Sequence, residues 1–232
     1  MVQTSPRAIP ALYRSTVGKK AIMAVTGAVL VLYLVAHMLG NLKVFFGPEE
    51  INEYAAWLRT IGSPVLHHEW FLWIMRVVLL ASLILHITMA AQLTARARRA
   101  RPARYRHRAK VQGSYAARTM RWGGVIIALF VIYHVLDLTT GTVHPEYEHG
   151  DVYGNLAADF APERWYVTLF YVLAVVAVGF HLRHGLVSAV QSLGLSSPQR
   201  ARALHLAASA FVVVLVAGYL SVPFAVTVGL VD

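Results

Sequence analysis

Five long apolar runs divide the chain, and shorter polar stretches separate them. The runs cover about residues 21–40, 70–93, 122–140, 165–190 and 204–231. A helix needs about 20 apolar residues to cross ~30 Å of hydrocarbon at ~1.5 Å of rise per residue. Segments that span a bilayer must also pack together to hide their polar groups. The pattern therefore predicts an all-α integral membrane protein, whose five transmembrane helices form a single domain over residues 1–232.

Basic residues are distributed unevenly between the two sets of connecting segments. Most of the 21 Lys and Arg precede the first run, separate the second from the third, or lie near the turn between the fourth and fifth. Only Lys43, Arg59, Arg76 and Arg164 belong to the other side, whereas all 11 Asp and Glu fall on that side. The positive-inside rule then predicts a cytoplasmic N-terminus and an outside C-terminus.

Composition narrows the possible functions. Hydrophobic residues make up 57% of the chain and there is no Cys, which excludes disulfides, thiolate-bound iron–sulfur clusters and c-type haem attachment. Lys19 and Lys20 precede an apolar run of full membrane length, unlike a cleaved signal peptide. The net charge of +10 suits anionic lipid or an acidic soluble partner. Nucleic acid is not favoured, because no aromatic platform accompanies the basic segment.

Histidines inside the apolar runs are the main candidates for chemistry. Five of the 11 histidines lie there: His37, His86, His134, His181 and His184. A polar side chain in hydrocarbon is costly, so each needs a partner or a function. An interhelical hydrogen bond would explain one such histidine, but four separate runs contain at least one.

Depth in the membrane sorts these histidines into two pairs. His37 and His134 lie roughly 24 and 18 Å from the inner edge, whereas His86 and His181 lie within roughly 6–8 Å of it. Two imidazoles at one depth on different helices can ligate haem iron from both faces. Zinc would require more donors than each pair supplies. A proton relay would normally include buried acids, and we expect none at the centre of the bundle.

Three glycines suit the haem interpretation. Gly27 precedes His37 by ten residues, or about 15 Å, which places it near the inner pair. Gly123 and Gly124 stand similarly to His134. A glycine lets a helix backbone approach a flat porphyrin, although close helix packing also uses small residues.

Several motifs together resemble one protein family. They are GKKAIMAVTG at 18–27, HMLGNL at 37–42, LHI at 85–87 with ARP at 100–102, YH at 133–134, and FHLRHG at 180–185 with QSLG at 191–194. In order and spacing they resemble the cytochrome b subunit of succinate dehydrogenase, which is the five-helix, di-haem membrane anchor of complex II. The resemblance covers nearly the whole chain.

This resemblance implies cofactors, partners and ligands. It implies two b-type haems and two soluble cytoplasmic partners: a flavoprotein with FAD and the succinate site, and an iron–sulfur subunit. The outer, distal haem would be held by His37 and His134, and the inner, proximal haem by His86 and His181. His184 is an alternative ligand, because it lies one turn from His181 on the same face. The complex would reduce menaquinone or another quinone in the bacterial cytoplasmic (inner) membrane, and it could form a higher oligomer.

Propionates and quinone require further polar residues. Arg76 is a candidate propionate partner at the distal haem, although it could instead reach the outer interface beside Glu69. Lys20, Arg14 and Arg183 are candidates at the proximal haem. Quinone reduction takes up two protons, so an acid–base group should lie near the quinone. The outer-side candidates are Glu53, Tyr54, His67, His68 and Glu69, and a cytoplasmic-side site is also open.

Two alternatives stay open at this point. A fumarate reductase anchor would use the same architecture in reverse. A non-redox transporter or structural anchor would use its histidines only for hydrogen bonds, although the repeats and broken helices typical of transporters are not evident.

Overall fold

The structure is a computed structural model that describes residues 13–100 and 115–231. Expectations that rest on Arg7, on the basic residues between 101 and 110, and on Asp232 lie outside the described residues. Within the described ranges the chain is helical and contains no strand.

Five helices are long and apolar enough to cross a membrane, which confirms the predicted fold class. They are α2 (Thr16–Asn41), α4 (Trp70–Arg99), α5 (Tyr115–Leu138), α7 (Trp165–Ser192) and α8 (Pro198–Thr227). Several begin or end beyond the apolar runs, because polar residues at the membrane surface can continue a helix. In α4, for example, the last turn contains Arg96, Arg98 and Arg99, whose charges suit the negative end of the helix dipole.

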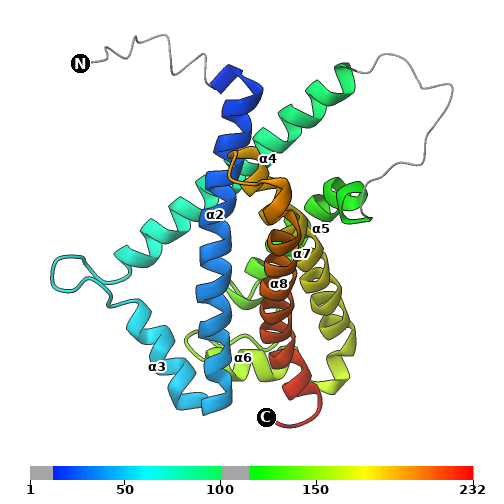
Figure 1. The fold of residues 1–232 in the computed structure, drawn as a ribbon. Helices are drawn as coiled ribbons and strands as arrows, with labels where there is room; N and C mark the ends of the chain where they lie inside the picture. The colour runs from blue at the N-terminus through cyan, green and yellow to red at the C-terminus, as the bar shows by residue number, and fades with distance from the viewer. Residues whose placement is uncertain (1–12, 101–114, 232) are drawn as a thin grey trace.

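The two ends of the bundle differ. The basic end contains the start of α2, the end of α4 and the start of α8 (Figure 1). Its cations include Lys19, Lys20, Arg96, Arg98, Arg99, Arg200 and Arg202. At the opposite end, here called the α3–α6 end, lie the short helices η1 (Leu42–Phe46), α3 (Pro48–Leu58), α6 (Val152–Asp159) and η2 (Pro162–Arg164). The start of α2 and the end of α8 lie at opposite ends, as an odd number of spans requires.

Helix α2 is central to the packing, since it contacts α4, α7 and α8, while α7 packs between α5 and α8. Small residues allow the closest approaches. A Cβ added to Gly179 of α7 would lie 2.8 Å from Val216 Cγ2 of α8, and Gly218 of α8 faces Met38 of α2 in the same way. Small residues at helix contacts are a common means of association within lipid.

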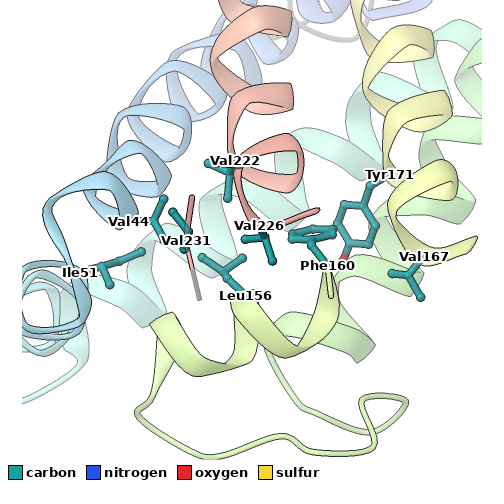
Figure 2. Close-up of a cluster of buried hydrophobic side chains, with 10 residues drawn as sticks. Val44, Ile51, Leu156, Phe160, Val167, Tyr171, Val222, Val226 and Val231 are labelled. Atoms are coloured by element: carbon teal, nitrogen blue, oxygen red, sulfur yellow. The ribbon is translucent and has the colours of Figure 1, made fainter. Parts of the chain in front are cut away.

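A buried apolar cluster joins the helices at the α3–α6 end (Figure 2). Its members are Val44, Ile51, Leu156, Phe160, Val167, Tyr171, Val222, Ala225, Val226 and Val231. The side chain of Asn52 ties α3 to α6, because its Oδ1 accepts from the N–H groups of Val152 (2.8 Å) and Tyr153 (3.1 Å). Its Nδ2 also donates to Asp151, the N-cap of α6, at 2.9 Å. These contacts anchor the connecting helices over the mouth of the bundle.

Candidate functional site

The four histidines that were expected to form two pairs do lie together as two pairs. The ring centroids of His37 (α2) and His134 (α5) are 5.8 Å apart, and those of His86 (α4) and His181 (α7) are 6.2 Å apart. An imidazole nitrogen lies about 2 Å from a bound transition metal, and the ring centre about 1 Å further, so two rings on opposite sides of one iron have centroids about 6 Å apart. Both pairs fit that spacing.

The two pairs lie at different levels along the bundle. Gly27 of α2 is level with His86, because an added Cβ there would lie 3.3 Å from His86 Cε1. Gly124 of α5 is near His181, with a corresponding distance of 3.9 Å to Cε1, whereas a Cβ on Gly123 would meet nothing within 4 Å. His37 follows Gly27 by ten residues, or about 15 Å of helix. The pair of His86 and His181 is therefore nearer the basic end, and we call it the inner pair; His37 and His134 form the outer pair.

Within the inner pair, one imidazole is fixed by a backbone hydrogen bond. Nδ1 of His86 lies 3.1 Å from the carbonyl oxygen of Met23 on α2. A carbonyl oxygen only accepts, so Nδ1 carries the hydrogen and the lone pair of Nε2 is left for a metal. Nδ1 of His181 is buried and has no hydrogen-bond partner among the described residues.

In the outer pair, the partner of the His134 Nδ1 atom is the hydroxyl oxygen of a tyrosine. The hydroxyl of Tyr171 on α7 donates to Oδ2 of Asp137 at 2.9 Å, and its oxygen lies 3.3 Å from Nδ1 of His134. Since the hydroxyl hydrogen is used by Asp137, the tyrosine oxygen accepts from Nδ1–H of His134. His37 is held differently, stacked on the ring of Tyr33 at 5.3 Å and tilted against Tyr219 at 6.2 Å.

Two fully buried acids lie beside the outer pair, at the ends of their helices rather than at the centre of the bundle. Asp137 at the end of α5 and Asp159 at the end of α6 both have 0% exposure. Arg164 forms an ion pair with Asp159 at 3.0 Å. The sequence placed these acids at outer span ends, and the structure adds that they are buried there beneath the connecting helices. The available signal was the spacing of His134 and Asp137, which puts both on one helix face.

At the basic end, Lys19 is buried, although the sequence did not single it out as a propionate candidate. Lys19 is 4% exposed, donates to Gln92 of α4, and lies 4.7 Å from the centre of the Tyr13 ring. Lys20 and Arg14 are exposed. Arg183 is half-buried, with its Nε donating to Ser209 Oγ at 2.8 Å. His184 is also half-buried, one turn beyond His181 on α7.

The remaining candidates do not form one cluster. Arg76 is exposed and lies over Trp73, 4.6 Å from the ring centre, while Glu69 pairs with Arg59 at 3.4 Å. Glu69 thus has Arg59 as its ion-pair partner, and the exposed Arg76 packs on Trp73.

Two groups of quinone-site candidates are separate. Glu53 and Tyr54 line a surface recess with Lys43, Glu50 and Trp57. His67 and His68 lie exposed in the connection before α4, where the His67 ring packs against Trp70 with centroids 5.3 Å apart.

Together, the fold and this site define a multi-pass helical membrane protein with two half-buried imidazole pairs at different depths. A family model described as the succinate dehydrogenase/fumarate reductase transmembrane subunit matches residues 94–219, just over half of the chain. The chain therefore belongs to that family of oxidoreductase subunits, which confirms the resemblance seen in the sequence. The match includes His134, His181 and His184, whereas His37 and His86 precede it. No curated protein and no solved structure matches the chain.

Proposed function

We propose that this chain is the haem b-containing membrane anchor of a succinate:quinone oxidoreductase. It passes electrons from an iron–sulfur subunit at the basic end, through an inner and an outer haem, to a quinone. This proposal rests on the two pairs of imidazole rings, whose centroids are 6.2 and 5.8 Å apart and which lie at two levels of one bundle.

Four side chains would hold the two haems: His86 and His181 the proximal one, His37 and His134 the distal one. Haem iron with two axial imidazoles undergoes one-electron reduction without an open site for oxygen. The hydrogen bonds at Nδ1 of His86 and His134 fix the tautomer of each ring and leave the lone pair of Nε2 free, so that this atom would ligate the metal. His181 remains our choice over His184, because its ring is the one that faces His86.

Cations near each level would neutralise the haem propionates. At the inner level, the buried Lys19 joins the candidates Lys20 and Arg183, and its burial makes it the strongest of the three. Arg76 remains the candidate for the distal haem, because its one described contact is the ring of Trp73, so its guanidinium hydrogens are available to a carboxylate.

A quinone, with menaquinone as our first choice, would be reduced at the α3–α6 end. The recess lined by Glu53 and Tyr54 contains a carboxylate and a phenol, which can exchange protons with a reduced quinone. Glu50 and Lys43 form an ion pair at 3.0 Å within the same recess. Its substrate would arrive from the lipid, because the exposed side chains of Phe45 and Phe46 follow Lys43 in η1.

The basic end would be cytoplasmic and would dock the soluble partners. Its exposed cations suit an acidic surface on the iron–sulfur subunit, which would in turn carry the FAD-containing flavoprotein. The membrane would be the bacterial inner membrane. Fumarate reduction, the reverse reaction, is the second candidate, supported by the same family description.

Visible spectroscopy of the purified complex tests the proposal directly. We expect a reduced b-type α-band, two haems per chain by pyridine haemochrome, and co-purifying flavin and iron–sulfur subunits. A natively assembled complex without haem would rule the proposal out and would favour the non-redox anchor or transporter.

A further inference from the structure

The two buried acids beside the outer pair have few partners that could stabilise two negative charges. Asp137 and Asp159 are both fully buried, and the charge of Asp137 is close enough to raise the pKa of Asp159. A buried ionised carboxylate needs donors or cations, so two of them together are costly unless one is protonated. Apart from the contacts of Asp137 with Tyr171 and of Asp159 with Arg164, no donor among the described residues reaches the oxygens of either acid.

The charges around the acids also indicate that only one of the two carboxyl groups is ionised. Arg164 supplies one positive charge at 3.0 Å from Asp159. His144 lies 3.8 Å from Asp159, but its Nε2 donates to the carbonyl of Asn155 and its Nδ1 accepts from the N–H of Glu146. Those two bonds define a neutral imidazole. One cation therefore balances one carboxylate, and the other carboxyl group is neutral.

No other charged group faces this site from the packed elements that the structure describes. Tyr133 of α5 and Tyr171 of α7 contribute neutral phenols, while the carboxylates of Glu146 and Glu163 are exposed. Burial, together with the charge of Asp137, raises the pKa of Asp159 to about 7, although Arg164 acts in the opposite direction. The shared proton can therefore leave or return near neutral pH.

Tyr171 connects this proton to the outer pair. Its hydroxyl joins Asp137 (2.9 Å) to His134 (3.3 Å), so the acids and the imidazole share one hydrogen-bonded chain. Loss of the proton adds a negative charge within a region of low dielectric constant. That charge stabilises positive charge at the imidazole and at any metal bound to it.

We propose that Asp137 and Asp159 hold one exchangeable proton that Tyr171 couples to the redox state of the outer histidine pair. As one electron reduces the iron held by His37 and His134, one proton from water at the α3–α6 end binds to the acid pair. Oxidation of that iron releases the proton, and no other bond forms or breaks. Tyr171 is thus a positioning residue that acts through His134. This inference rests on the proposed function, because it requires an outer haem.

A redox titration of the intact complex over about pH 6 to pH 9 tests the coupling. The midpoint potential of the outer haem should fall as pH rises, with an upper limit of about 59 mV per pH unit, the one-electron equivalent of a tenfold change. Asp137→Asn and Asp159→Asn should each flatten this slope. Tyr171→Phe should retain the haem but reduce the slope.

Tyr219→Phe is the matched control. Tyr219 contacts His37, the other member of the outer pair, but its hydroxyl donates to the carbonyl of Leu34 rather than to an acid. This variant should keep the wild-type slope. Equal slopes in Tyr171→Phe, Tyr219→Phe and wild type would overturn the coupling.

Infrared spectroscopy provides a readout that does not depend on activity. Wild-type complex should show the carbonyl band of a protonated carboxylic acid that disappears as pH rises, and each Asn variant should alter it. If the Asn variants fail to assemble, the wild-type band and the two tyrosine variants still decide the question. A complex that contains haem but shows a pH-independent outer potential overturns this inference alone, whereas a haem-free complex overturns the proposed function as well.

Discussion

Gly27 on α2 packs against the imidazole of His86 on α4: a Cβ placed on this glycine would lie 3.3 Å from His86 Cε1. That distance is tighter than an ordinary van der Waals contact, so His86 would have to shift by a few tenths of an ångström to admit a methyl group. The hydrogen bond from His86 to Met23 opposes the shift, because it ties the same ring to the same helix.

The first prediction concerns this contact. Gly27→Leu should remove the inner haem, because the larger side chain displaces the His86 ring, whereas Gly27→Ala should retain the haem with an altered electron paramagnetic resonance signal. The outer haem is the internal control, since Gly27 lies about 15 Å from its level. An unchanged inner haem in Gly27→Leu would show that no ring occupies this space.

Single substitutions of the paired histidines should remove one haem each. His37→Ala or His134→Ala should lower the haem content from two to one per chain and abolish the outer signal. His86→Ala or His181→Ala should abolish the inner signal instead. The physical reason is that one imidazole cannot hold a low-spin, six-coordinate iron alone.

His184→Ala is the control for the ligand substitutions, and it should retain both haems. Loss of the same haem from His37→Ala and His86→Ala would refute the pairing. Retention of both haems in His181→Ala, with loss in His184→Ala, would reassign the fourth ligand.

The neighbouring lysines of α2 should have different effects. Lys19→Met removes a buried positive charge, so it should lower the midpoint potential of the inner haem. Oxidised iron carries more positive charge than reduced iron, and the loss of a nearby cation therefore favours the oxidised form. Lys20→Met removes an exposed charge that water and salt screen, so it should lower that potential much less. Optical redox titration of the two variants makes the comparison, and equal shifts would show that burial of Lys19 does not matter.

Asn52 should contribute to stability without a role in electron transfer. Asn52→Ala removes one donor and one acceptor that together bond Asp151, Val152 and Tyr153, so the free energy of unfolding should fall by about 1–3 kcal/mol. Thermal unfolding in mild detergent measures the loss. Thr142→Ala removes an exposed hydroxyl at the same end and should change stability by less than about 0.5 kcal/mol. A similar loss in both variants would contradict the anchoring role of Asn52.

Asp159 should make stability depend on pH. Its pKa is raised to about 7 in the folded protein, above the ordinary value of 3.8, so between these values the folded state binds more protons than the unfolded state. This contribution to stability is therefore fully present below the lower value and is lost as pH rises through about 7.

Asp159→Asn isolates that contribution. The unfolding temperature of wild type, relative to this variant, should be higher at about pH 5 than at about pH 8. A difference that stays constant across this range would show that the acid pair holds no extra proton.

The sequence by itself determined the membrane architecture and the two histidine levels. Apolar runs of membrane length admit few structures other than spanning helices, because backbone polar groups must be satisfied within each span. Depth then follows from counting residues at a constant rise along each helix. Counting therefore placed His37 with His134 and His86 with His181, and it placed Gly27 near the inner level.

Only the tertiary structure decided which polar groups are buried at the ends of the bundle. The rotation and tilt of α2 bury Lys19 and expose Lys20, although the two are adjacent in sequence. Asp137 and Asp159 are 22 residues apart, and both are fully buried because short helices outside the spans cover that end of the bundle. Local patterns do not encode such contacts, since they depend on how separate helices and loops pack in three dimensions.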